Sequence, residues 1–207
     1  MVADERMLIW SIDETSGFDT AWASTRDGRL RAEGSACGLR PTPYWVSYVL
    51  ETADAYVTQR MTAHARWEGG TATLDLRRDD SGWSVNGKPR ADLDAALDCD
   101  LGACPLTNTM PILRHELHRT PGDHGFTMAF IEVPSLQVVA SSQRYTHLRT
   151  TDDGGAIVRY RSGSFQSDLV IDRDGFVVDY PQLGRRVEPQ TPVAGIRSAG
   201  PGSARPD

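Results

Sequence analysis

Hydrophobic and polar residues alternate between residues 55 and 67, the clearest pattern in the chain. Every second residue is apolar from Met61 to Trp67, and the residues between them, such as His64, are polar. Successive side chains of a β-strand point to opposite faces of its sheet, so this period of two predicts a long, half-buried strand. A similar pattern over residues 71–78 is followed by the turn-forming sequence DDSG, and together with residues 83–85 it predicts a hairpin.

Further apolar runs recur at short, fairly even spacing and are separated by turn-forming sequences such as DDGG and DRDG. They predict strands over residues 44–51, 126–133, 136–148, 156–161, 167–172 and 176–180. No convincing helix separates successive strands, which disfavours a parallel α/β arrangement. The pattern therefore indicates a mainly β protein, with antiparallel strands in a rolled sheet, sandwich or barrel.

The predicted strand at residues 126–133 differs from the others because it is apolar on both faces. Phe126, Met128 and Phe130 share one face, and Ala129 and Ile131 lie on the other. Such a strand needs cover on both sides. A sheet that curls around on itself, or that a helix plugs, supplies this cover and can leave a lined groove between its layers.

A stretch rich in polar and reactive side chains, LDCDLGACPLTNTMPILRHELHR, occupies residues 97–119. In a strand, Asp92, Asp94, Asp98 and Asp100 share one face and residues such as Cys99 lie on the other, although Leu93, Leu97 and Leu101 recur every four residues and also fit a helix. The aspartates form an acidic stripe that is either a divalent cation site or a solvated face. We favour the solvated face, because exposed carboxylates are readily hydrated and a cation site needs ligands from several directions.

The residue types in this stretch also suggest a zinc site. Cys99, Cys104, His115 and His118 are of the right ligand types, but each pair lies at or beyond the edge of the usual spacing. In a strand the two histidines would also point to opposite faces. We therefore expect buried thiols and a hydrogen-bonded core histidine, and we expect neither a metal nor another cofactor.

The composition fits one domain and excludes one class of partner. The chain has 207 residues, of which 39% are hydrophobic and 24% charged. We expect a single domain over residues 1–187 and a flexible tail, rich in Pro, Gly and Ser, over residues 188–207. The net charge of −6 offers no attraction to phosphate backbones, so nucleic acid is not an expected partner.

Three features bear on the compartment. The apolar run at residues 7–10 is too short for a signal peptide, which predicts a cytoplasmic protein. No window approaches the about 18 apolar residues of a spanning helix, so we expect no membrane insertion. The odd number of cysteines, Cys37, Cys99 and Cys104, favours free thiols.

A second polar segment, QRYTHL at residues 143–148, places Gln143 and Tyr145 on one strand face and Arg144 on the other. Arg144 has two interpretations: it clamps an anionic or sugar headgroup, or it pairs with Asp168 or Asp179 inside the sheet. We favour the ion pair, since the donor fork of arginine commonly fastens neighbouring strands through carboxylates.

Four segments together resemble the signature sequences of a family of bacterial proteins described as glycolipid-binding. They are LDCDLGACPLTNTMPI, QRYTHL, YRSGSF and GFVVDYPQLGRR, and the resemblance extends from Trp10 to about Arg186. It implies an antiparallel spiral β-roll with few short helices, similar in architecture to lipoprotein carriers that hold acyl chains. It also implies a small amphiphilic ligand, either a glycolipid or an acyl chain.

The residues and the resemblance together favour a non-catalytic carrier or sensor of this ligand, which needs apolar walls and a few polar groups at the mouth of a groove. Pro111 is expected to begin a strand, after a turn that holds Thr107. The residues expected to contact the ligand are Asn108, Arg114, Met128, Phe130, Arg144, Tyr145 and Tyr180.

The alternative is a hydrolase that uses carboxylate or histidine side chains of the same groove, with Asp98, Asp100 and His115 as candidates. A nucleophilic serine has little support. Ala36 stands at the centre of GSACG, where the G-x-S-x-G motif requires serine.

Overall fold

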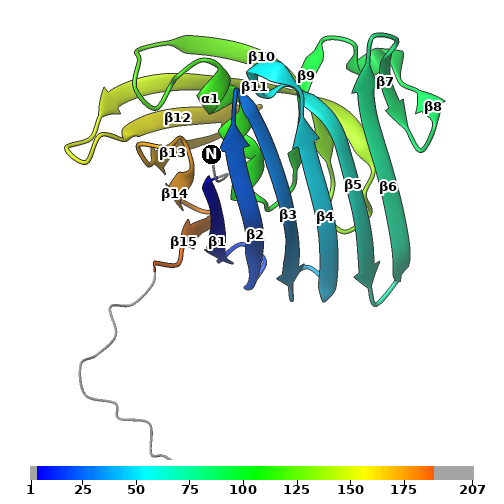
Figure 1. Cartoon of the computed structure of the whole chain (residues 1–207). Helices are drawn as coiled ribbons and strands as arrows, with labels where there is room; N and C mark the ends of the chain where they lie inside the picture. Colours follow the sequence, from blue (N-terminus) through cyan, green and yellow to red (C-terminus); the bar gives the residue numbers. More distant parts are fainter. Residues whose placement is uncertain (1–3, 189–207) are drawn as a thin grey trace, which may run out of the picture.

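The computed structural model describes residues 4–188, which form one 15-stranded sheet, one α-helix and three short 3-10 helices (Figure 1). The predicted mainly β fold is confirmed. The tail predicted over residues 188–207 lies outside the described residues, except for Glu188. The strands are β1 (Asp4–Ile12), β2 (Gly17–Arg26), β3 (Arg29–Gly38), β4 (Tyr44–Thr52), β5 (Thr58–Trp67), β6 (Gly70–Asp79), β7 (Gly82–Val85), β8 (Lys88–Pro89), β9 (Ala96–Leu101), β10 (Asp123–Ile131), β11 (Val138–Thr150), β12 (Ala156–Ser162), β13 (Phe165–Ile171), β14 (Val177–Tyr180) and β15 (Gly184–Arg186).

The strands expected from the alternation are present, with shifts of a few residues at their ends. The predicted hairpin is the pair of β6 and β7, in which Asp79 lies opposite Gly82. Strand β5 begins at Thr58, later than predicted, because the 3-10 helix η1 (Asp54–Tyr56) occupies the start of the alternating segment. The strands β1, β2 and β3 precede all of the predicted ones.

The order of strands in the sheet is β8-β7-β6-β5-β4-β3-β2-β1-β15-β14-β13-β12-β11-β10-β9. The chain thus winds outward from β1 to β8, and its last strand, β15, returns to pair with β1. Among the described strands, only β9 and β10 are parallel. Parallel neighbours need a crossover connection. Here it contains the 3-10 helix η3 (Pro105–Asn108) and helix α1 (Thr109–Arg114).

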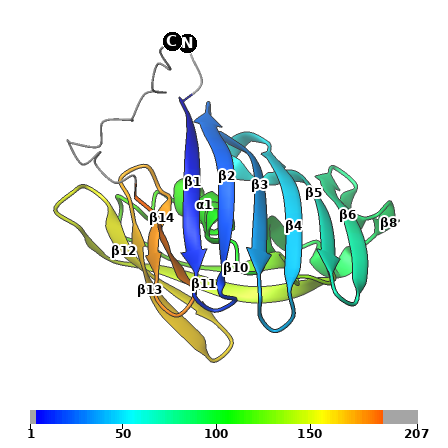
Figure 2. The ribbon, with the colours of Figure 1, turned by 90° about the horizontal axis from the view of Figure 1, so that it is seen from below.

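The sheet rolls over itself without closing into a barrel. Figures 1 and 2 show β10, β11 and β12 running across the layer formed by β1–β6, with α1 between the two layers. The two ends of the sheet meet through side chains. The Trp83 indole on β7 donates to the Ala96 carbonyl of β9 at 2.9 Å, and the Cys99 N–H of β9 donates to the Thr58 hydroxyl at 3.0 Å.

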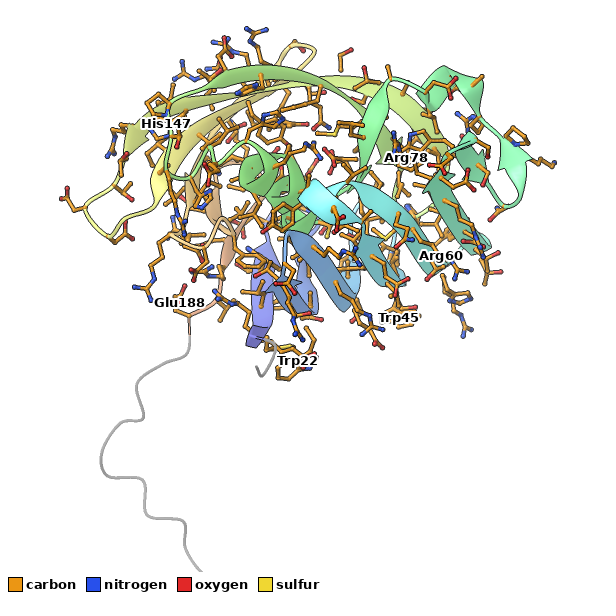
Figure 3. The ribbon with its side chains drawn as sticks, turned by 45° about the horizontal axis from the view of Figure 1, so that its top comes forward. Trp22, Trp45, Arg60, Arg78, His147 and Glu188 are labelled. Atoms are coloured by element: carbon orange, nitrogen blue, oxygen red, sulfur yellow. The ribbon has the colours of Figure 1, made fainter. Side chains whose placement is uncertain are left out.

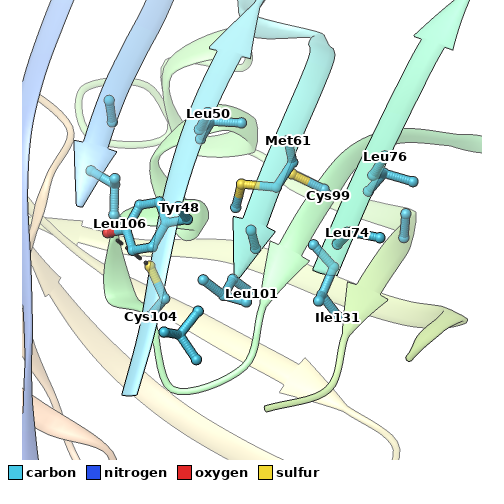
Figure 4. Close-up of a cluster of buried hydrophobic side chains, with 14 of the residues drawn as sticks. Tyr48, Leu50, Met61, Leu74, Leu76, Cys99, Leu101, Cys104, Leu106 and Ile131 are labelled. Carbon is cyan, nitrogen blue, oxygen red and sulfur yellow. Dashed lines mark hydrogen bonds between the residues drawn. The ribbon is translucent and has the colours of Figure 1, made fainter. Parts of the chain in front are cut away.

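The apolar core fills the space between the layers. Figure 4 shows Tyr48, Leu50 and Met61 of β4 and β5 facing Cys99 and Leu101 of β9, and all five are buried. Each large apolar side chain buried in this way contributes about 1.5–3 kcal/mol relative to an exposed one. This packing fixes β9 in position, and β9 carries the two aspartates of the polar stretch.

The outer face of β1–β5 is open to solvent. Trp22 on β2 and Trp45 on β4 project outward from this face, with 58% and 46% of their surface exposed (Figure 3). The alternation of apolar and polar residues in these strands therefore reflects an inner face that is covered and an outer face that is open to solvent.

Candidate functional site

The polar stretch folds as β9, η3 and α1, and one prediction for it is wrong. Pro111 does not begin a strand; it is the third residue of α1. Proline is tolerated there because the N–H groups of the first helical turn have no partner within the helix. Met110, Pro111 and Ile112 are all buried. A six-residue helix that is covered on all sides leaves no amphipathic pattern in the sequence.

The interpretation of the aspartates as a solvated face is confirmed for Asp92 and Asp94, which are exposed, but it is wrong for Asp98, which is buried. Only 1% of the Asp98 side chain is exposed, and both its oxygens accept hydrogen bonds from the guanidinium of Arg114, itself 9% exposed. Helix α1 presents Arg114 to β9, and the guanidinium also lies 5.8 Å from the centre of the Phe126 ring. Burial raises the pKa of Asp98, while the ion pair with Arg114 opposes this shift. An aspartate in this setting holds the helix to the sheet.

Asp100 on the same strand is held by two neutral donors. Its Oδ1 accepts from the Thr107 hydroxyl at 2.7 Å, and its Oδ2 accepts from the Gln143 amide at 2.6 Å. No arginine or lysine pairs with it within the described residues, and burial raises its pKa. Because Asp98 is ion-paired with Arg114 and Asp100 is held only by neutral donors, Asp100 is the stronger site candidate of the two aspartates.

The hydroxyl of Tyr145 joins this network on the side of α1. It donates to Asn108 Oδ1 at 2.9 Å and lies 3.2 Å from Gln143 Oε1, while the Asn108 amide donates to the Pro105 carbonyl at 3.3 Å. Such connected buried groups fix one another's orientation. We call these buried groups the polar core; it consists of the hydrogen-bonded network of Asp100, Thr107, Asn108, Gln143 and Tyr145 together with the ion pair of Asp98 and Arg114.

A separate buried carboxyl group lies in the other layer. Asp19 on β2 is completely buried and accepts a hydrogen bond from the Tyr48 hydroxyl at 3.0 Å; the Cys104 thiol in turn donates to that hydroxyl at 3.5 Å (Figure 4). Burial raises the pKa of Asp19 to about 7. Gly34 makes room for the tyrosine, since a Cβ at residue 34 would lie 2.6 Å from the Tyr48 hydroxyl oxygen.

A cavity of about 780 Å³ opens beside the polar core. Its lining comes from both halves of the sheet. One half contributes the segment after β1, the segment before β4 and the start of β4, and the other contributes residues of β9–β14. Phe130, Phe165 and Leu183 contribute apolar surface, and Asp100 and Gln143 contribute polar surface. Asp100 is thus a member of the polar core that also faces the cavity.

A smaller cavity of about 660 Å³ lies on the other side of Gln143, which lines both. Arg144 belongs to this smaller cavity. It pairs with Asp123 at 2.5 Å and is about half exposed. The preference for an ion pair is therefore confirmed, but both predicted partners are wrong, because Asp168 pairs with Arg159 and Asp179 with Arg185.

The model of the family described as "Putative glycolipid-binding" matches residues 7–186. The chain belongs to this family. It is also similar to a solved structure, the crystal structure of a DUF1089 family protein from Pseudomonas aeruginosa, with a TM-score of 0.67 and 28% sequence identity. The similarity covers 82% of this chain and 92% of that one. No curated protein matches the chain.

The seven residues predicted to contact a ligand lie in four different parts of the structure. Phe130 and Tyr180 line the larger cavity, and Arg144 lines the smaller one. Met128 is 1% exposed in the core and lines neither. The remaining three, Asn108, Arg114 and Tyr145, belong to the polar core behind the larger cavity.

Several residues of the larger cavity were missed by sequence reasoning. Tyr160 and Phe165 lie within the YRSGSF segment that carries the family resemblance, so their segment was visible but their position was not. Thr15 and Tyr44 come from the other half of the sheet. Nothing in the local sequence connects them with the segments around Asp100, because the sheet must roll before they meet.

The zinc alternative finds no site in the described part of the chain, where no group of three or more His, Cys, Asp or Glu side chains is placed to hold a metal. Cys99 and Cys104 are buried free thiols, and Cys37 is exposed. The His115 ring packs against His124, with 4.2 Å between ring centres, and burial lowers the pKa of His115. Among the helices in residues 4–188, none is long and apolar enough to cross a membrane.

Proposed function

We propose that this protein binds a small glycolipid-like amphiphile in the larger cavity and acts as a non-catalytic carrier or sensor. The observation that carries the proposal is the cavity itself. Its volume of about 780 Å³ falls within the range of roughly 300–1,000 Å³ that small-molecule sites occupy. Its lining combines apolar walls with a few polar groups, as such sites usually do.

The apolar part of the lining suits a hydrocarbon chain. Phe130 and Val133, in and just after β10, line the same space as Leu183, which lies between β14 and β15. Each methylene that leaves water for such a surface contributes about 0.8 kcal/mol, so a chain of about ten carbons binds at micromolar concentration after ordering costs.

The polar part suits a headgroup. Asp100, Gln143, Tyr160 and Tyr180 line the cavity, and the first two are oriented by hydrogen bonds within the polar core. Asn108, Arg114 and Tyr145 then support the site without lining it. The family description, "Putative glycolipid-binding", adds weight to an amphiphile that has a polar head and an apolar chain.

Hydrolysis has less support from the geometry. Both Asp100 oxygens already accept hydrogen bonds, and Asp98 is engaged by Arg114. No histidine is among the described residues that line the larger cavity. A general base needs access to the proton that it abstracts; Asp98 does not line the larger cavity, and both oxygens of Asp100 are already held by donors.

Native mass spectrometry tests the proposal. Protein purified from its own host should carry a co-purifying amphiphile, and Phe130→Ser should reduce the occupied fraction several-fold by making the wall polar. Val139→Ser is the matched control, because Val139 lies opposite Phe130 in the strand pair, is 40% exposed and does not line the cavity. Equal occupancy in both variants would contradict the proposed site. Empty protein, together with no saturable binding of a fatty-acyl probe, would contradict the function.

A further inference from the structure

The larger cavity has an excess of acidic groups. Asp100, Glu14 and Glu132 are the acidic residues of its lining within the described chain, and Arg40 is the one basic residue. Glu14 and Glu132 are exposed, whereas Asp100 is buried deeper. The Arg40 guanidinium already donates to the Asp13 carbonyl at 2.7 Å. An anionic headgroup would therefore meet mainly like charges.

Three aromatic rings form a cluster on the same lining. The centre of the Tyr160 ring lies 6.0 Å from that of Phe165 and 5.8 Å from that of Tyr180, with interplanar angles of 63° and 64°. Rings set at such steep angles offer both edges and faces to the space beside them. Aromatic faces attract cations, and the attraction grows as the cation loses water.

The hydrogen bonds of Asp100 also favour a cation over a neutral sugar. Each of its two oxygens already accepts one hydrogen bond, from Thr107 and from Gln143, so only about two of its four lone pairs remain for the directed hydrogen bonds that sugar hydroxyls make. A positive charge needs no free lone pair, because it responds to the field of the carboxylate.

We propose that the headgroup of the ligand is an organic ammonium group, held beside Asp100 and the ring cluster of Tyr160, Phe165 and Tyr180. This inference rests on the proposed function and narrows it to amphiphiles that carry a positive charge. The ammonium group offsets the buried carboxylate, the rings receive its alkyl or N–H surface, and the chain follows Phe130 and Leu183.

Isothermal titration with three dodecyl amphiphiles below their micelle concentrations tests this inference. Dodecyltrimethylammonium should bind about tenfold tighter than dodecyl maltoside, and dodecyl sulfate should bind weakest. If the maltoside equals the ammonium probe, or the sulfate binds tightest, the headgroup assignment is wrong and the amphiphile cavity stands. If none of the three binds while circular dichroism shows folded protein, both proposals are wrong.

Two variants locate the effect. Asp100→Asn should reduce the preference for the ammonium probe over the maltoside to about threefold or less, because the carboxylate charge is lost. Since this change also touches the polar core, Glu132→Gln at the exposed rim is the second variant, with a few-fold loss of ammonium affinity at low salt. Glu116→Gln, exposed and outside the lining, is the control. Equal losses in Glu116→Gln and Glu132→Gln, or an unchanged preference in a folded Asp100→Asn protein, would overturn the assignment.

Discussion

The two halves of the rolled sheet bury different kinds of side chain. In strands β1–β6 the inner face is apolar, with residues such as Ala23, Ala63 and Leu76, and Asp19 is the one charged residue that is buried there. The half that contains β9–β14 and α1 holds the polar core. The first half provides a packed wall, and the second provides the polar groups that face the larger cavity.

Aspartate–arginine pairs show the same difference at the level of single contacts. Arg60 and Asp75 pair across β5 and β6 at 2.8 Å, with 40% and 33% of their side chains exposed. Asp98 and Arg114 form an equally direct pair with almost no exposure. A surface pair has a small net effect, while a broken buried pair leaves a charge without compensation. The same two residue types therefore have different importance in the two halves.

Replacing Arg114 gives the largest expected effect. Arg114→Ala should lower the free energy of unfolding by about 3–5 kcal/mol, because Asp98 is left buried without its partner. Arg60→Ala, the control in the other half, should cost less than about 1 kcal/mol. Urea unfolding of both variants measures the difference. Similar losses in the two would contradict the contrast between the halves.

The second prediction concerns the pH dependence of the free energy of unfolding and the contribution of Asp19 to it. Its pKa in the folded protein, about 7, lies above the ordinary value of 3.8, so the folded state binds the extra proton between these values. Stability from this group is therefore present below about pH 4 and is lost as the pH rises through 7. The loss is about 3 kcal/mol between about pH 4.5 and pH 7.

Asp19→Asn should remove that part of the pH dependence, because the amide does not titrate in this range. Urea unfolding of both proteins at several pH values gives the comparison. If the free energy of unfolding changes with pH in the same way for both proteins, burial does not raise the pKa of Asp19.

A smaller effect is expected at Tyr145. Tyr145→Phe removes the hydroxyl that donates to Asn108 and should destabilise the protein by about 1–3 kcal/mol, because a buried acceptor loses its donor. Tyr56→Phe is the control, since Tyr56 is partly exposed and its hydroxyl makes no hydrogen bond to the residues that the structure describes; its effect should stay within about 0.5 kcal/mol. Thermal or urea unfolding of both variants measures the difference, and equal effects would place Tyr145 outside any energetically coupled network.

These contrasts also explain how far the sequence predicts the structure. The alternation around Met61 and His64 predicted β5 because one face of that strand is covered and the other is wet. Asp98 and Leu101 follow the same alternation, yet both are buried, because the roll covers both faces of β9. Local patterns report how a strand is covered only when one side meets water.

The candidate site shows the same limit. Phe130 and Tyr180 were predicted because they lie in an apolar strand and in a segment that carries the family resemblance, and both line the larger cavity. Thr15 and Tyr44 line it too, but they reach it only through the pairing of β1 with β15 and the curl of the sheet. Long-range topology of this kind leaves no signal in the neighbouring sequence.

A crystal structure with dodecyl maltoside brominated at the end of its chain tests the central claim most directly, because bromine is located by its anomalous scattering. The account predicts one strong bromine peak within the larger cavity, beside Phe130 and Leu183, with the sugar toward Asp100 and Tyr160. The peak should be several-fold weaker in crystals of the Phe130→Ser variant. A bromine peak only in the smaller cavity, or only on the outer face near Trp22 and Trp45, would contradict the claim that this cavity binds an amphiphile.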